Sequence, residues 1–325
     1  MKRELCAMYD LLVIGDANPD VILSGVPRVP AYGQREELVD TGVLTVGGSG
    51  AIMACGAARL GLRTAFVGRV GDDEAGRFML SSLEARGVDV SACVIDPSRP
   101  TAMTVVLVEG PVVEDAGEQG DRHGDRAILT APGCLPYLSG RDVPRKLLAS
   151  ARHVHAASFF LQPRLAADLP SLFSATRANG AVTSLDTNDD PSGAWAGLDG
   201  VLAETDVLLP NEAEALAISG GGDVRDAARD LAARGVLPVV KRGQDGVLSW
   251  DGYMAIDAPA VPVTPVDTVG AGDSFDAGFV AARLRGLPLG AALRFAAACG
   301  SLSARAAGGT AAQATWEEAE SAAGI

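Results

Sequence analysis

The stretch DTVGAGDSFDAGF, residues 267–279, is the most informative part of this sequence for its fold. Three small residues, Gly270, Ala271 and Gly272, lead into the acid Asp273, and an apolar periodic segment follows. A helix that begins here has unpaired N–H groups, which together carry roughly half a positive charge. The pattern predicts an anion hole with a carboxylate beside it, although a plain helix cap after a glycine turn explains the same residues.

An anion hole next to an acid suits phosphoryl transfer. The amides would hold the transferring group, with about 3 kcal/mol from each well-placed donor. Asp273 would act as the general base that takes the proton of the attacking hydroxyl, an effect of about 10²–10⁴-fold.

Composition restricts the classes of function. The chain has 325 residues, 48% of them hydrophobic, and a net charge of −14, which disfavours nucleic acid and anionic membranes as partners. No apolar run reaches the roughly 18 residues of a membrane span, and we expect no signal peptide. Five scattered cysteines without a C-x-x-C pair favour a reducing cytoplasm. The missing G-x-x-x-x-G-K-[ST] and G-x-G-x-x-G patterns exclude ordinary P-loop and dinucleotide sites.

Strand-length apolar runs alternate with helical patterns along most of the chain. Runs such as 10–15 and 181–186 alternate with helical segments such as 49–61 and 74–87. This alternation predicts an α/β fold with a mostly parallel sheet. Further helices are expected near 272–286, 289–305 and 315–323.

Two stretches break this rhythm with short alternating runs and no helix between them, about 16–46 and 97–129. We expect them to form a small antiparallel sheet that projects from the main body. The charged, glycine-rich piece 111–125 is expected to be a hairpin tip. The body would then consist of residues 1–15, 47–96 and 130–325.

Residues at the ends of other predicted strands are candidates for ligand contacts. Asn18 and Asp20 end the first strand, and Gly47 and Gly48 precede a helix; a turn and a loop-to-helix joint are the simpler explanations. Gln162 follows another strand and could reach the same ligand, or it could be an ordinary loop residue.

Two later motifs have the same double interpretation. Asn211 and Glu214 lie three apart on the first turn of a helix, so they point the same way. They could hold a hydrated Mg²⁺ and phosphate oxygens, or they could form a capping box. Lys241 stands at a strand end before Gly243 and Gly246, where it either faces a phosphate or is solvated.

The segments GGSGAIMACGAARLGLRTAFVGRVGDDEAG and VDTVGAGDSFDAGF resemble the two signature regions of the ribokinase-like (PfkB) family of carbohydrate kinases. NPD, PNEAE and VKRGQDG match intermediate motifs in the same order, so the resemblance spans nearly the whole chain. It implies a three-layer α/β/α fold with a central, mostly parallel sheet and a small antiparallel β lid that often forms a dimer contact. It also implies transfer of the γ-phosphoryl group of ATP to a sugar or nucleoside hydroxyl with Mg²⁺, often activated by K⁺.

The resemblance gives each matched position a role. The base and the anion hole are Asp273 and Gly270–Gly272, and the sugar contacts are Asp20 and Gly47–Gly48. The Mg²⁺–phosphate region is Asn211 and Glu214, the nucleotide contacts include Lys241 and Gly243, and Asp267 with the carbonyl of Val269 belongs to a monovalent-cation loop.

Two departures leave the acceptor open. The family usually has Asn where this chain has Ile52, and Arg where it has Asp190. Asp190 would repel an acidic acceptor if it faced the pocket, which favours a small neutral sugar. A nucleoside kinase, with a base pocket from Ile52 and Phe159–Phe160, is the nearest alternative, and a non-catalytic sensor is a third that the intact Asp273 argues against.

Overall fold

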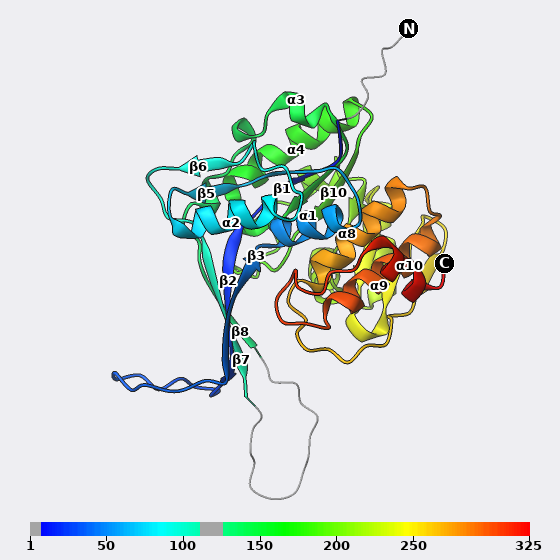
Figure 1. Ribbon diagram of the computed structural model, residues 1–325. Helices are drawn as coiled ribbons and strands as arrows, with labels where there is room; N and C mark the ends of the chain where they lie inside the picture. Colours follow the sequence, from blue (N-terminus) through cyan, green and yellow to red (C-terminus); the bar gives the residue numbers. More distant parts are fainter. Residues whose placement is uncertain (1–7, 111–125) are drawn as a thin grey trace, which may run out of the picture.

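The computed structural model describes residues 8–110 and 126–325 (Figure 1). The helices are α1 (Ser49–Arg59), α2 (Glu74–Glu84), α3 (Arg145–Leu148), α4 (Pro163–Ala178), α5 (Asp199–Leu202), α6 (Glu212–Ser219), α7 (Val224–Ala233), α8 (Ala271–Leu284), α9 (Leu289–Ser303) and α10 (Trp316–Ala323). The strands are β1 (Tyr9–Ile14), β2 (Asn18–Val26), β3 (Thr41–Gly47), β4 (Thr64–Val67), β5 (Arg69–Gly71), β6 (Val94–Asp96), β7 (Met103–Glu109), β8 (Arg126–Ala131), β9 (Ala151–Ala157), β10 (Val182–Asp186), β11 (Val207–Leu208), β12 (Leu237–Lys241), β13 (Val247–Trp250) and β14 (Ala255–Ala258).

An eight-stranded sheet in the order β14-β13-β12-β11-β10-β9-β1-β4 forms the middle layer. Pairings from β12 through to β4 are parallel, and β13 and β14 add an antiparallel edge. Alternate residues of β1 enter two different cores: Leu11 and Val13 pack with α1, α8 and α9, whereas Leu12 and Ile14 pack with α4 and α7. The predicted α/β fold with a mostly parallel sheet is confirmed.

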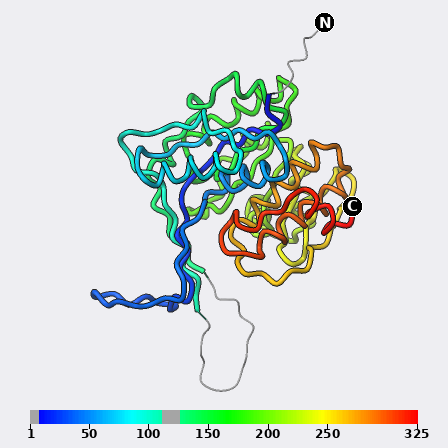
Figure 2. The backbone as a smooth tube through the Cα atoms, in the orientation of Figure 1, coloured from blue at the N-terminus to red at the C-terminus, as the bar shows by residue number. Residues whose placement is uncertain are grey.

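The lid is a separate four-stranded sheet in the order β3-β2-β7-β8 that projects from the body (Figures 1 and 2). The predicted antiparallel pairing is confirmed for β2–β3 and β7–β8, but the central pair β2–β7 is parallel. The sequence did not indicate this, because the chain passes through the body between β2 and β7 and re-enters the lid in the same direction. The predicted hairpin tip 111–125 lies outside the described residues.

Several local differences have clear causes. The run 63–70 is divided into β4 and β5 at Gly68, where a Cβ atom would lie 2.6 Å from the Phe66 ring and 2.9 Å from the Gly15 carbonyl oxygen. The expected helices near 49–61, 74–87 and 272–286 are present but end two or three residues earlier, which is the usual uncertainty of helix ends. Within the described ranges, no helix combines the length and the apolar composition needed to cross a bilayer.

Candidate active site

The predicted ligand residues gather at the carboxyl edge of the central sheet. The segments that follow β1, β9, β10, β11 and β12 meet there with the N-termini of α1, α6 and α8. Ligands of open α/β sheets bind at this edge. The lid strand β2 starts from the same place, because only three residues separate it from β1.

The N-terminus of α8 has no side-chain cap. Gly270 is its N-cap residue, with a left-handed φ of 72°, and a Cβ atom there would lie 2.5 Å from Gly309 Cα, so only glycine fits. The N–H of Ala271 donates to the Thr268 carbonyl oxygen at 3.2 Å. The N–H groups of Gly270, Gly272 and Asp273 have no hydrogen-bond partner among the described residues. The predicted anion hole therefore offers one amide fewer than expected, because the N–H of Ala271 already bonds within the protein.

Asp273 is buried in the first turn of α8, with 9% of its surface exposed. Burial and the negative charge of Asp186 raise its pKa to about 8, whereas the Lys241 ammonium opposes that rise. The Ser49 hydroxyl at the start of α1 is a hydrogen-bond partner of the carboxylate. A carboxyl group with a pKa near neutral pH has the acidity that a general base needs.

On the lid side, Asn18 and Asp20 begin strand β2. Asn18 Nδ2 donates to Asp20 Oδ1 and to Thr104 Oγ1, both at 3.0 Å. Burial, Asp16 and Asp267 raise the pKa of Asp20 to about 7. The Asp20 carboxyl group therefore lies at the base of the lid, where it can form a hydrogen bond with a hydroxyl group.

Gly47 and Gly48 make the joint between β3 and α1. A Cβ atom on Gly47 would lie 1.9 Å from Asp20 Oδ1, and Gly48 has a φ of 82° with the Asp16 carbonyl oxygen 2.8 Å from its Cβ position. The first amides of α1 are already bonded, because Ser49 N and Gly50 N donate to the Asp16 carboxylate at 3.1 and 2.9 Å. Asp16 therefore satisfies the first amides of α1. The sequence analysis did not single out Asp16, although it lies two residues before the NPD motif.

A second network that the sequence analysis missed reaches Ser49. Ser158 and Asn188 both have left-handed φ angles, 56° and 54°. The Asn188 side chain accepts from Ser158 N at 3.0 Å and donates to Ser49 Oγ at 2.6 Å. Two residues in this uncommon conformation therefore hold the serine that contacts Asp273.

Asn211 and Glu214 form the capping box that was one of the two predicted explanations. Glu214 N donates to Asn211 Oδ1, and Asn211 N donates to Glu214 Oε2, each at 2.9 Å. Burial and Asp186 raise the pKa of Glu214 to about 7, so the site favours a nearby cation. Within the described residues no group of three or more His, Cys, Asp or Glu side chains could hold a metal.

Lys241 does not have a free ammonium group. Its Nζ lies 2.7 Å from Asp186 Oδ2 and 3.2 Å from Asp276 Oδ2, and the lysine side chain is 13% exposed. The predicted solvated strand end is wrong. Gly243 and Gly246, with φ angles of 55° and 83°, form the turn between β12 and β13, and a Cβ atom on Gly246 would lie 2.1 Å from the Ala258 carbonyl oxygen.

Three other residues lie differently from the predictions. Gln162 is fully buried, and its Nε2 donates to the Ala157 and Ser158 carbonyl oxygens at 2.8 and 3.3 Å, so it is held by backbone instead of pointing to a ligand. Asp190 accepts from Trp195 N at 2.7 Å and faces its own loop, so its charge is no argument against an acidic acceptor. Ile52 is 2% exposed and packs against Gly270 and Gly309.

Asp267 joins the two loops beside the anion hole. Its carboxylate accepts from Val269 N at 2.9 Å and from Gly308 N at 2.8 Å. Arg126 of the lid donates to Thr268 Oγ1 at 3.2 Å, so the lid touches the loop that leads into α8.

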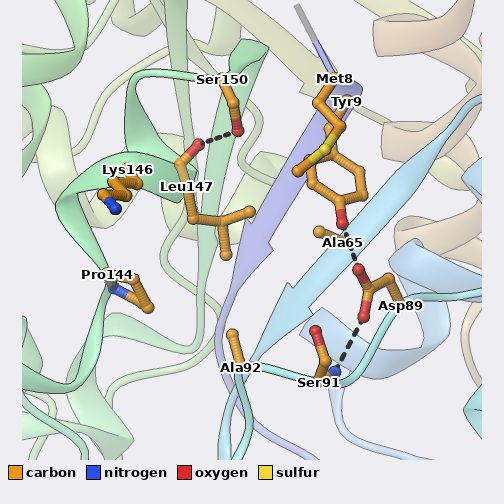
Figure 3. Close-up of a pocket in the computed structure, with 10 residues that line it drawn as sticks. All are labelled: Met8, Tyr9, Ala65, Asp89, Ser91, Ala92, Pro144, Lys146, Leu147 and Ser150. Atoms are coloured by element: carbon orange, nitrogen blue, oxygen red, sulfur yellow. Dashed lines mark hydrogen bonds between the residues drawn. The ribbon is translucent and has the colours of Figure 1, made fainter.

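Two cavities lie at the opposite, amino edge of the sheet. One of about 240 Å³ is shown in Figure 3, where the Tyr9 hydroxyl points to the Asp89 carboxylate and Lys146 lies on the opposite side from Tyr9. The other, of about 550 Å³, is lined by His153, Asp206 and Phe279 among others. Neither cavity contains a residue of the candidate site, so neither contributes to its chemistry.

The chain is similar to known proteins along nearly its whole length. A model of the pfkB family carbohydrate kinases matches residues 8–316. A fructokinase of Klebsiella pneumoniae is 32% identical over 312 residues, covering 91% of this chain and 93% of that protein. A ribokinase of Bacillus subtilis is 30% identical over 307 residues, covering 91% and 93%. The structure of Arabidopsis thaliana ribokinase with ribose and ATP is similar at a TM-score of 0.82 and 25% identity, covering 98% and 99%.

Proposed function

Because the chain belongs to the pfkB family of carbohydrate kinases, we propose that it phosphorylates a small neutral sugar with Asp273 as general base. The neutral acceptor is inferred from the fructokinase and ribokinase relatives, since Asp190 faces its own loop and gives no support for it. The observation that supports this most is the pairing of a buried carboxyl group of raised pKa with unpaired amides at the start of α8. ATP is the phosphoryl donor, as in the ribokinase that was solved with ribose and ATP.

The reaction follows from the positions of these groups. Asp20 and the joint at Gly47 and Gly48 hold the acceptor with one hydroxyl directed at Asp273. As the hydroxyl oxygen forms its bond to the γ-phosphorus, Asp273 takes the hydroxyl proton, and the bond from that phosphorus to the ADP oxygen breaks. The amides of Gly272 and Asp273 stabilise the charge on the transferring group.

The cations have separate places in this proposal. Mg²⁺ neutralises the phosphates when it is bound, and Asn211 and Glu214 would hold it through water, with Gly243 and Gly246 along the nucleotide. An Escherichia coli structure of similar fold, described as a ribokinase II, holds ATP and Mg²⁺. Asp267 and the Val269 carbonyl would form the K⁺ loop, because the Asp267 carboxylate already joins residues 269 and 308.

The outer face of the lid supports a homodimer. Val21, Leu44, Val105 and Leu129 are in register across all four strands, and Leu44 and Leu129 are 56% and 58% exposed. Asp20 and Thr104 lie on the opposite face, because side chains alternate along a strand. Leu44→Glu should convert a dimer to a monomer in light scattering; a wild-type chain that is already monomeric would exclude this contact.

A nucleoside is the second candidate acceptor. Phe160 makes edge-to-face contacts with Phe159 and Trp195, at centroid distances of 5.1 and 5.3 Å, and such rings can contact a base.

The four cysteines in the described ranges are free thiols, which is compatible with a reducing cytoplasm as the location.

ADP release measured over free sugars, sugar acids and nucleosides, with Mg²⁺ and with or without K⁺, tests the function. We expect the highest kcat/KM with a neutral sugar, and kcat at least about 100-fold lower in Asp273→Asn. A preference for nucleosides would favour the second candidate, a preference for sugar acids would reject the neutral acceptor, and binding without ADP release would reject catalysis.

A further inference from the structure

A buried cluster of one ammonium and two carboxyl groups lies beneath the first turns of α8. Lys241 Nζ lies 2.7 Å from Asp186 Oδ2 and 3.2 Å from both carboxyl oxygens of Asp276. The Asp186 and Asp276 side chains are 4% and 1% exposed. Burial raises the pKa of Asp276 well above its ordinary value, whereas at Asp186 burial is outweighed by the Lys241 ammonium together with hydrogen bonds, which lower the pKa. Asp186, at 2.7 Å, is therefore the main partner of the Lys241 charge.

The cluster connects three elements at one point. Asp186 ends β10, Lys241 ends β12, and Asp276 lies on α8 three residues after Asp273. Residues three apart on a helix lie on the same side, so a contact that fixes Asp276 also fixes the rotation of Asp273. A Cβ atom on Gly272 would lie 3.5 Å from Lys241 Nζ, so the ammonium lies directly beneath the anion-hole residue.

Polar contacts continue along the same face of the sheet toward its amino edge. Ser184 Oγ lies 2.7 Å from His153 Nε2 and 2.8 Å from His155 Nδ1, and all three side chains are buried. Burial lowers the pKa of both histidines to about 3, so they are neutral. The neighbouring strand β1 presents only apolar residues to this face. Directional polar contacts fix the register of packed elements more strictly than apolar packing does.

We propose that Lys241 acts from inside the fold as a positioning residue: held between Asp186 and Asp276, it fixes the N-terminal turns of α8, and with them the base and the amides, over the sheet. The inference rests on the proposed function, since it concerns how that base is held. It replaces the phosphate-facing role that the sequence suggested for Lys241. A buried ion pair of this kind adds little net stability, so the cluster is better explained by the position that it imposes.

The cluster also acts on Asp273 through its charge. The groups that face Asp273 come from five parts of the chain: Asp186 of β10, Lys241 of β12, Asp16 after β1, the Ser49 hydroxyl of α1 and, on α8 itself, Asp276. Among the charges, Asp186 raises the pKa of Asp273 most, and Lys241 opposes it. A variant that keeps Lys241 but neutralises Asp186 should therefore lower that pKa.

The first test uses a matched pair at Asp276. Asp276→Asn keeps a donor for Asp186 and an acceptor for Lys241, whereas Asp276→Leu removes both. We expect Asp276→Leu to lower kcat at least about tenfold with the KM for ATP within about twofold, and Asp276→Asn to restore most of kcat. Equal kcat in the two variants would overturn the proposal.

The second test separates positioning from stability and from nucleotide binding. Lys241→Met leaves the Asp186 carboxylate without its partner and should destabilise the protein; adding Asp186→Asn removes that unpaired charge and should restore the melting temperature. We expect the double variant to remain at least about tenfold below wild type in kcat, with Lys146→Met as the control lysine. Full activity of the folded double variant would show that the cluster serves stability alone, and a raised KM for ATP with normal kcat would show that Lys241 contacts the nucleotide; both overturn the proposal.

The third test uses pH. Asp186→Asn should shift the acidic limb of kcat/KM to lower pH than in wild type, and an unshifted limb would overturn the electrostatic part. All three tests compare variants on whichever acceptor wild type phosphorylates. The tests can therefore fail while the proposed function stands. Both proposals would be rejected only if the Asp273→Asn variant kept normal turnover.

Discussion

The N-termini of α6 and α8 lie at the same edge of the sheet, but their first backbone N–H groups are satisfied in different ways. At α6, Asn211 and Glu214 bond to each other's backbone N–H groups. At α8, Gly270 has no side chain to offer, and the amides of Gly272 and Asp273 have no partner in the described part of the chain. A helix that caps itself is complete without a ligand, whereas the start of α8 is satisfied only by water or an anion. We therefore expect a larger chemical contribution from Asp273 than from Glu214.

Replacing Asp273 and Glu214 each by its amide should give the largest contrast in kcat between the two helices. Asp273→Asn should lower kcat by at least about 100-fold with little change in ATP binding, because the variant cannot accept the hydroxyl proton. Glu214→Gln should lower kcat far less at saturating Mg²⁺. Steady-state kinetics and ATP titration measure both, and equal losses would remove the contrast between the two helices.

The glycines next to these helices give the second contrast. Gly270→Ala should lower kcat about tenfold or more and destabilise the protein by roughly 2–3 kcal/mol, because its Cβ meets Gly309 and φ is 72°. Gly220 at the C-terminus of α6 is the control, since it has a φ of 96° but no atom within 4 Å of its Cβ position. Gly220→Ala should cost only about 1 kcal/mol in urea unfolding and leave kcat unchanged. Similar losses in both variants would argue against a tight fit at Gly270.

The pH dependence of kcat/KM tests the ionisation of the acid on α8. The pKa of Asp273 is raised to about 8, so most of this group is protonated at pH 7. Activity should rise roughly tenfold from pH 7 to a plateau above the pKa, because the base must be ionised. A profile that is flat from pH 6.5 to pH 9 would contradict a base with this pKa.

Magnesium titration tests whether the capped helix also serves the cation. Glu214→Gln should raise the Mg²⁺ concentration for half-maximal activity several-fold, because a charge near the phosphates is lost. Glu212→Gln is the control, since Glu212 is on the same turn but pairs with Arg242 at 3.3 Å. An unchanged titration would leave Glu214 with its capping role alone.

The smallest effect concerns stability. A carboxyl group whose pKa is raised on folding destabilises the protein as pH rises from its unfolded value, near 4, through about 8. Asp273→Asn should therefore be more stable than wild type at pH 8.5 by an amount on the order of 1 kcal/mol, and no more stable at pH 4. Denaturant unfolding at the two pH values measures this, and a variant less stable than wild type at pH 8.5 would contradict it.

The sequence predicted features that depend on local residues. The glycine turn before Asp273, the capping box at Asn211 and the alternation of strands and helices could all be read from neighbouring positions. Features that depend on residues distant in sequence could not. The partners of Lys241 are 55 and 35 positions away, and the Asn188–Ser49 bond spans 139 positions. Asp190 stands where the family pattern usually has Arg, and only the structure shows that its carboxylate faces residues 192–195 instead of an acceptor.

The parallel pair at the centre of the lid has a consequence for how the molecule assembles. Strands β2 and β7 can run side by side in the same direction only after the intervening chain has made its crossover through the body. The pairs β2–β3 and β7–β8 are local, but the complete four-stranded lid cannot form before this crossover, and contacts this distant in sequence form late. We expect its amide protons to exchange with solvent well before those of β1 and β9, so that a folded body with an open lid is a natural intermediate.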